Sequence, residues 1–277
     1  MKSILNRTLL IVLCVTITVP ILLTALYSFE SLSVIAEYAE RIASPTVTGM
    51  LNIKLFPEFA SIRQYKRILI DEVAYIRYYA NSAIYGLSVA LGQMVIGIFT
   101  AYALGCFQLK HRNLLFFLFV AVMILPFQVT MAPNYFVLDR MNLLDTPYAI
   151  ILPGIFMPFC TFMYRQYFVG LPSELFDAAV MDGAHSMNIL LRVVVPLSKP
   201  LICAGAVLSF VDAWNLVEQP LIYFKNGALY PLSLALMMDG GKATIFAKST
   251  LFLLPPLLLL LYYYQDIIDG IQMCDLK

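Results

Sequence analysis

Long stretches without a charged side chain constrain this chain more than any other feature. Asn81–Leu109 and Leu114–Leu138 contain no Asp, Glu, Lys or Arg. An α-helix needs about 20 mostly apolar residues to cross the hydrocarbon core of a bilayer. Each stretch is long enough to do so, and such stretches recur along the chain. The sequence therefore predicts an all-α integral membrane protein that has the lipid bilayer as its solvent.

The composition agrees with this prediction. Apolar residues make up 61% of the chain and charged residues 13%, and the mean hydropathy is +0.82. The charged share is about half that of an average globular domain, which leaves too little polar surface to cover a water-exposed fold. Since the apolar segments run from end to end, we expect one membrane domain. The net charge of +1 gives no indication of nucleic-acid binding.

Six segments are predicted to span the membrane. The first follows Lys2 and Arg7 and is too long for the apolar core of a cleaved signal peptide, so we expect it to be retained. The fifth carries two acidic residues, Asp212 and Glu218. The predicted spans are about 8–28, within Asn81–Leu109, within Leu114–Leu138, about Thr146 to Tyr164, about 200–220 and about 246–265.

The spans define the expected organisation of the chain. Segment 29–80 mixes charged, aromatic and turn residues, so we expect a small external cap or surface helices there. Asn81 or Ser82 is a suitable N-cap for the second span. The expected parts are a first transmembrane helix (1–28), an external segment (29–80), a transmembrane core (81–268) and a short cytoplasmic tail (269–277).

Basic residues in the short loops predict the orientation, because cytoplasmic loops are enriched in Lys and Arg. With both termini in the cytoplasm, most basic residues near the spans lie inside, although Lys225, Lys242 and Lys248 fit this arrangement poorly. The residues placed inside are Lys2, Arg7, Lys110, His111, Arg112, Arg165, Arg192 and Lys199.

Prolines and cysteines are less informative. Prolines inside spans indicate either kinked helices around a cavity or simply the higher proline content of membrane helices. The cysteines are scattered without a C-x-x-C pair, so we expect neither a disulfide framework nor a metal site. The prolines in or beside spans are Pro20, Pro126, Pro133, Pro153, Pro158, Pro255 and Pro256.

The segment 170–200 has the pattern of a helix-turn-helix. Pro172 and Ser173 suit a helix start, and acidic residues follow in the first turns, where the helix dipole favours them. Gly183 suits a helix end that needs positive φ, and Ser186 can cap a second short helix through about Leu191. The small residues Ala178-Ala179 would let another surface approach closely. We therefore expect a docking element for a cytoplasmic partner.

This segment resembles the EAA loop of bacterial ABC importer permeases, whose pattern is Glu-Ala-Ala, three residues, Gly, nine residues and Ile-x-Leu-Pro. Here the pattern reads Asp177-Ala178-Ala179, Gly183 and Val193-Val194-Val195-Pro196 with the same spacing. Asp replaces Glu, and Val replaces Ile and Leu. The residues expected to dock an ATPase are Glu174, Asp177, Ala178, Ala179, Met181, Asp182, Gly183, Val193 and Pro196.

The resemblance covers roughly residues 60–268 and is to the carbohydrate-uptake branch typified by the smaller membrane subunit of the maltose transporter. The fragments that carry it outside the loop are Asn81-Ser82, Leu125-Pro126-Phe127-Gln128, Ala132-Pro133, Leu143-Leu144-Asp145-Thr146, Phe210, Trp214-Asn215 and Pro220-Leu221. The tail Gly270–Lys277 lacks the branch's usual Gly-Ala-rich ending.

The resemblance implies a non-catalytic subunit in a bacterial inner membrane. Two permeases, here expected to be different, would form a path for a carbohydrate that an external binding protein delivers. Two ATPase subunits would bind ATP and Mg²⁺ and drive alternating access through a coupling helix at about Ser173–Gly183. The chain itself has no phosphate loop of the form G-x-x-x-x-G-K-[ST] and is expected to bind no cofactor.

Candidate path residues lie in the third and fifth spans. Asp212 could face the solute, lie near the outer interface or pair within a permease dimer. Trp214 could stack on a sugar beside Asn215, or serve as an interfacial anchor. Neutral side chains of the third span could bind a sugar or join helices. The candidates are Gln128, Thr130, Asn134, Asp212, Trp214 and Asn215.

Three other classes compete with an importer permease. A secondary transporter often shows internal repeats, which we do not find here, and it would leave the docking element unexplained. A membrane-embedded enzyme needs clustered His, Asp or Glu inside the membrane, and the spans lack such clusters. ABC exporters lack a loop of this kind.

Overall fold

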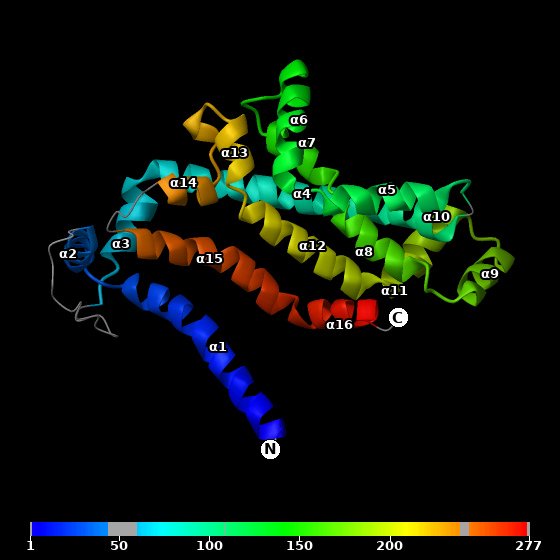
Figure 1. Ribbon diagram of the computed structural model, residues 1–277, viewed down its shortest axis with the longest axis horizontal. Helices are drawn as coiled ribbons and strands as arrows, with labels where there is room; N and C mark the ends of the chain where they lie inside the picture. The colour runs from blue at the N-terminus through cyan, green and yellow to red at the C-terminus, as the bar shows by residue number, and fades with distance from the viewer. Residues whose placement is uncertain (1, 44–59, 108, 239–243, 276–277) are drawn as a thin grey trace. The chain divides into compact units, whose positions relative to one another are not determined.

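The computed structural model describes residues 2–43, 60–107, 109–238 and 244–275. Within these ranges the chain is built from helices and contains no strand, which confirms the all-α class (Figure 1). It forms two compact units. One comprises Met1–Tyr79 with Leu232–Pro255, and the other comprises Ala80–Pro231 with Pro256–Lys277.

Four helices in the described ranges are long and apolar enough to cross a membrane, and the number rises to six if each of two bent helix pairs is one span. These elements correspond to the six predicted spans. The four are Asn6–Tyr27 within α1 (Lys2–Tyr27), α4 (Val73–Cys106), Tyr148–Phe168 over α7 (Tyr148–Ile155) and α8 (Phe159–Phe168), and α15 (Ile245–Tyr262).

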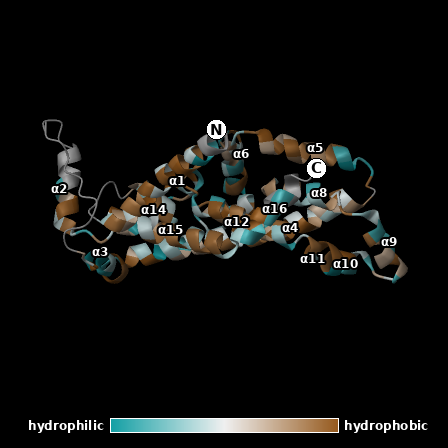
Figure 2. Cartoon of the chain, turned by 90° about the horizontal axis from the view of Figure 1, so that it is seen from below, coloured by the Kyte–Doolittle hydropathy of each residue, from teal (hydrophilic) through white to brown (hydrophobic). Residues whose placement is uncertain are grey.

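The third predicted span consists of two helices that meet at a bend. α5 (Arg112–Ile124) and α6 (Phe127–Arg140) meet at a bend of 103°. Leu125 is extended, with ψ of 130°, because the ring of Pro126 disfavours helical geometry in the residue before it. No residue of α5 is buried within this chain, and Figure 2 shows α5 coloured mostly as hydrophobic, as suits a face covered by lipid or another subunit.

The second span begins earlier than predicted. α4 starts at Val73, so Asn81 lies inside the helix and not at its N-cap. Its side-chain amide donates instead to the backbone oxygens of Ala228 and Tyr230, at 2.8 and 3.0 Å. Tyr75 in the added turns is buried, and its hydroxyl donates to the Lys248 carbonyl at 3.2 Å. Tertiary contacts thus extend the helix beyond its uncharged run.

The segment predicted as external contains short helices. These are α2 (Leu32–Ala43), α3 (Arg63–Lys66) and the π-helical turn η1 (Arg67–Asp71). Residues 44–59 of this segment lie outside the described residues. After η1, Glu72 forms an ion pair with Lys248, with Oε2 and Nζ 2.7 Å apart. This pairing neutralises one of the lysines that fitted the charge rule poorly.

The fifth span ends before residue 220. The second bent pair consists of Ser186–Leu197 and α12 (Lys199–Trp214), at 80° to each other. Asn215 terminates α12, and its side chain donates to the Val211 carbonyl at 2.7 Å. Glu218 therefore lies outside the span, in the first turn of the separate helix α13 (Glu218–Tyr223).

The C-terminal region is more ordered than a short tail. α16 (Tyr264–Asp275) packs along α12, and residues 269–275, predicted as tail, continue this helix. A Cβ at Gly270 would lie 3.1 Å from both the Ala204 Cβ and the Leu201 Cα. The glycine therefore permits the close approach of the two helices.

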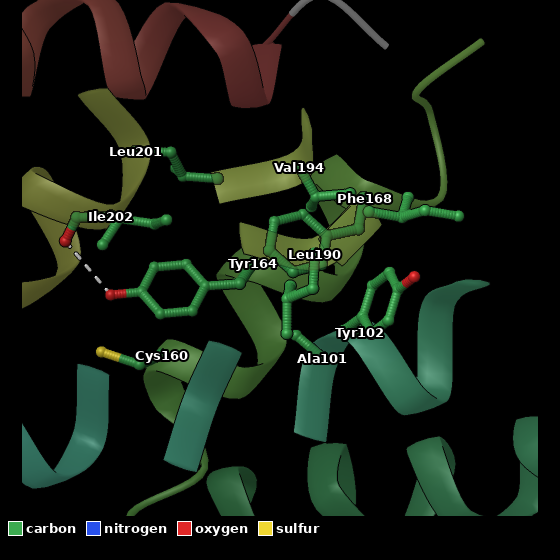
Figure 3. Packing of buried hydrophobic residues seen from close by; sticks show 10 residues of the cluster. Ala101, Tyr102, Cys160, Tyr164, Phe168, Leu190, Val194, Leu201 and Ile202 are labelled. Carbon is green, nitrogen blue, oxygen red and sulfur yellow. Dashed lines mark hydrogen bonds between the residues drawn. The ribbon is translucent and has the colours of Figure 1, made fainter. Parts of the chain in front are cut away.

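A buried cluster joins α4, α8, α12 and the π-helical turn η2 (Leu190–Val194) (Figure 3). Tyr164 is fully buried at its centre, and its hydroxyl donates to the Ile202 carbonyl at 3.2 Å. A Cβ at Gly205 would lie 2.9 Å from the Tyr164 Cε1, so the ring needs a glycine opposite it. Side chains of the segment 176–195, such as Phe176 and Val193, pack against this cluster.

Candidate functional site

The predicted docking helix is present as α9 (Ser173–Met181), which begins after Pro172 and has Glu174 in its first turn. Gly183 adopts φ of +76°, the left-handed conformation that glycine reaches without strain. The Gly183 amide donates to the Val180 carbonyl and the Ala184 amide to the Ala179 carbonyl, each at 2.9 Å. This is a Schellman motif, the C-terminal structure that the glycine predicted.

The second half of the element differs from the prediction. His185, not Ser186, is the N-cap, and its Nδ1 accepts from the Met187 amide at 3.5 Å. The chain continues without a break past Leu191. It runs through α10 (Ser186–Ile189), the π-helical turn η2 and α11 (Val195–Leu197), which contains Pro196.

α9 has two different faces. Phe176 and Ala179 are partly buried and pack against the cluster around Tyr164. On the opposite side of the helix Met181 is 87% exposed. The other predicted docking residues divide in the same way. Val193 packs on the cluster, and Glu174, Asp177, Ala178, Asp182, Gly183 and Pro196 are exposed.

Two tyrosines hold the element to the rest of its unit. Tyr102 of α4 donates from its hydroxyl to the Ser186 carbonyl at 3.2 Å. Tyr167 of α8 donates to the Leu197 carbonyl at 3.3 Å. Figure 1 shows α9 at one end of this unit, beside α10 and away from α6 and α13. A displacement of the element would therefore be transmitted directly to α4 and α8.

A cavity of about 560 Å³ lies within the same unit, and two helix breaks line it. Leu125 and Phe127 flank the break between α5 and α6, whereas Met157 and Pro158 form the break between α7 and α8. Irregular backbone at membrane depth is tolerated where it is buried in protein or lines a water-filled cavity. Pro126 and Pro158 thus both lie at helix breaks beside the cavity, and the first break is a bend of 103°.

A polar network supports the second break. Proline has no amide hydrogen, so Pro158 cannot satisfy the carbonyl of Gly154 four residues earlier. The Gln93 side-chain amide donates to this carbonyl at 2.9 Å. The Ser209 hydroxyl in turn donates to the Gln93 Oε1 at 2.8 Å, and the Cys160 Sγ lies 3.1 Å from the Ser209 Oγ. The network thus ties α4, α8 and α12 together along the cavity wall.

The sequence reasoning did not identify Gln93 and Ser209. A signal was present for Gln93, because it is a strongly polar side chain in the middle of an uncharged span. Ser209 carried no such signal, since serine often bonds only within its own helix.

Of the predicted path residues, the structure brings Thr130 and Asp212 to the cavity. Gln128 lies in a separate hollow with Ala132 and Phe136, and it donates to the Glu218 Oε2 at 3.3 Å.

The remaining three path candidates have partners within the chain. Trp214 is fully buried with its ring centroid 5.4 Å from that of Phe210, so it is neither open to a solute nor at the surface. Asn134 hydrogen-bonds with Tyr223. Asn215 ends α12 as described above. None of the three lines the cavity.

The cavity and the docking element hold no metal-ligand cluster among the described residues, where no three His, Cys, Asp or Glu side chains converge. Cys14, Cys106, Cys160 and Cys203 are free thiols.

Comparisons with known proteins place this architecture among transport proteins. Residues 93–270 match the family described as "Binding-protein-dependent transport system inner membrane component". The arabinooligosaccharides transport system permease protein AraQ of Bacillus subtilis (strain 168) is 31% identical over 186 residues, 67% of this chain and 66% of AraQ. The sn-glycerol-3-phosphate transport system permease protein UgpE of Yersinia pestis is 34% identical over 149 residues, 54% of this chain and 53% of UgpE. The matches thus span less than two thirds of the length of these relatives.

A solved structure has the same fold. The crystal structure of a bacterial ABC transporter involved in the import of the acidic polysaccharide alginate contains a chain that superimposes with a TM-score of 0.77. The match covers 95% of each chain at 21% sequence identity. At this identity the likeness concerns the fold.

Proposed function

The chain belongs to the family of binding-protein-dependent transport system inner membrane components, and on this premise we propose that it is a permease subunit of an ABC importer for a carbohydrate. The observation that carries the proposal is the α9–α11 element. It presents an exposed face at one end of its unit and is anchored by Tyr102 and Tyr167 to two helices of the membrane domain. A surface that binds a separate ATPase subunit needs both an exposed face and firm attachment to the membrane helices.

In this proposal α9 is the coupling helix that binds an ATPase subunit. Its exposed residues Glu174, Asp177, Ala178, Met181 and Asp182 contact the ATPase. The inward side chains of Ala179 and Val193 hold the element against the core. Gly183 shapes the turn after α9, and Pro196 lies near the return to the membrane.

The cavity is the part of the solute path that this chain contributes. Thr130 and Asp212 line it together with the buried Gln93 and Ser209. Helix breaks next to a cavity are typical of transport sites. Movement of α9 by the ATPase would reach the cavity through α8 and α12, which pack against each other and contribute to the cluster that α9 contacts.

The other components of the proposed importer are separate polypeptides. ATP and Mg²⁺ are bound by two ATPase subunits, so this chain has no catalytic activity of its own. A second, different permease completes the path, and an external binding protein delivers the solute. We place the chain in a bacterial inner membrane with both termini in the cytoplasm, 29–80 outside, 81–268 as the transmembrane core and 269–277 inside.

The relatives leave the charge of the solute open. Their names include a neutral class, the arabinooligosaccharides, and a phosphate ester, sn-glycerol-3-phosphate. The resemblance of residues 60–268 to the carbohydrate-uptake branch favours a carbohydrate as the solute.

Co-purification tests the proposal. A tagged chain expressed with its neighbouring genes should recover a second permease and a soluble ATPase. Ala178→Trp adds bulk on the exposed face of α9 and should abolish recovery of the ATPase but not of the second permease. Leu221→Trp, at an exposed position of the short helix α13, is the matched control and should leave recovery unchanged.

Two results would contradict the proposal. One is unchanged ATPase recovery with Ala178→Trp. The other is solute uptake by this chain alone in ATP-free vesicles, which would favour a secondary transporter.

A further inference from the structure

The polar groups around the cavity are unequally available to a solute. Gln93 and Ser209 are buried, and they are bonded to Gly154 and to each other. The Thr130 hydroxyl donates its hydrogen to the Phe127 carbonyl at 2.8 Å. The Ser209 and Thr130 hydroxyl hydrogens and one hydrogen of the Gln93 amide are therefore engaged inside the protein, whereas the Thr130 oxygen keeps acceptor capacity.

Asp212 is the one charged residue among those lining the cavity. It lies one turn after Ser209 on α12, on the same face of the helix, and its side chain is exposed. No Lys, Arg or His lines the cavity in the described part of the chain. The other lining residues are apolar, for example Phe127 and Phe159, so little in the wall offsets a negative charge.

From this distribution we propose that the cavity discriminates by charge, accepting neutral polyhydroxylated solutes and rejecting anionic ones such as uronic acids or sugar phosphates. Sugar hydroxyls can donate to the carboxylate and to the Thr130 oxygen, which are acceptors. A carboxylate or phosphate on the solute needs donors or cations and finds a like charge instead. In a site partly shielded from water such repulsion is much stronger than in bulk solution.

This inference deepens the proposed function, because it gives the solute class of the proposed path. It can nevertheless be measured without transport. A cysteine introduced at Met157, on the wall of the cavity, reports the local potential through its reaction with charged methanethiosulfonate reagents. The experiment uses the purified complete chain in lipid nanodiscs. The parent protein without the added cysteine supplies the background rate.

The cationic reagent should modify Met157→Cys at least about tenfold faster than the anionic reagent, after correction for their intrinsic reactivities. Adding Asp212→Asn should bring this ratio close to that of an exposed control, Leu221→Cys, whereas Asp212→Glu should preserve it. Asp212→Asn and Asp212→Glu both keep a polar side chain of similar size. Comparing them therefore separates the effect of losing the charge from an effect on folding. Equal rates in the presence of Asp212, or no effect of Asp212→Asn, would overturn the inference.

Uptake by the reconstituted importer provides the second readout. Neutral oligosaccharides should be transported and their uronic-acid counterparts excluded, and efficient uptake of the acids would overturn the inference. If the chain assembles no importer, the proposed function fails, and the reagent rates still decide the charge of the cavity.

Discussion

At the scale of single residues, Gln93 adds a second donor to a carbonyl beside a helix break. Its amide donates to the Gly154 carbonyl, which also accepts from the Met157 amide at 3.2 Å, and its oxygen accepts from Ser209. A buried polar group without a partner is costly because no water is available to bond it. Gln93 and Ser209 thus satisfy each other in the buried wall beside the second break.

Replacing this glutamine should therefore destabilise the protein. Gln93→Leu leaves the Ser209 hydroxyl without its acceptor and removes the side-chain donor to Gly154, and should cost about 1–3 kcal/mol of unfolding free energy. Unfolding by denaturant in detergent micelles measures this change. Leu91→Ala, at a position 55% exposed in the same helix, is the control and should have a smaller effect. Equal stability of Gln93→Leu and the parent would show that the network does not support the break.

At the scale of elements, the two alanines of α9 have different neighbours although they are adjacent in sequence. Ala178 is exposed, whereas Ala179 packs against the cluster around Tyr164 and also ends the helix through its Schellman bond to Ala184. One small residue is therefore available to a partner, and the other is needed by this chain itself.

Leucine substitutions should separate these two roles. Ala179→Leu overpacks the contact between α9 and the core and should reduce stability by about 1–3 kcal/mol. Ala178→Leu should leave stability unchanged within about 0.5 kcal/mol and should act only on recovery of the ATPase. Thermal unfolding together with co-purification gives both readouts. A loss of stability in Ala178→Leu that equals the loss in Ala179→Leu would contradict the assignment of the two faces.

At the scale of the whole molecule, the number of crossings depends on the bent pairs. Four helices can span the membrane by themselves, and each bent pair is either a broken span or a re-entrant loop. Six or four crossings leave both termini on one side, whereas five would separate them. The ends of the chain therefore test whether a single bent pair is re-entrant.

Both termini should be cytoplasmic. Epitope tags at either end should resist protease in intact spheroplasts and become sensitive after lysis. A cysteine introduced at Asn226, in the segment after α13, should react with a membrane-impermeant reagent from outside and serves as the opposite control. Protection of only one tag would mean that one bent pair is re-entrant.

The sequence by itself determined the features that depend on local chemistry. Uncharged apolar runs predict spans because lipid replaces water around them. The end of α9 was predictable at Gly183, because a positive φ is a property of one residue and its neighbours. The resemblance of segment 170–200 to the permease loop could also be recognised from the sequence, because that pattern is defined by the spacing of residues within one continuous segment.

The tertiary structure decided what depends on distant segments meeting. The start of α4 at Val73, the burial of Trp214 and the packing of α16 on α12 follow from contacts that no local pattern encodes. The cavity is a further example, because its wall combines two helix breaks with Gln93 and Asp212 from other helices. Hydropathy reports how apolar a segment is, but only packing decides which polar side chain satisfies another segment's backbone and which one remains open to a solute.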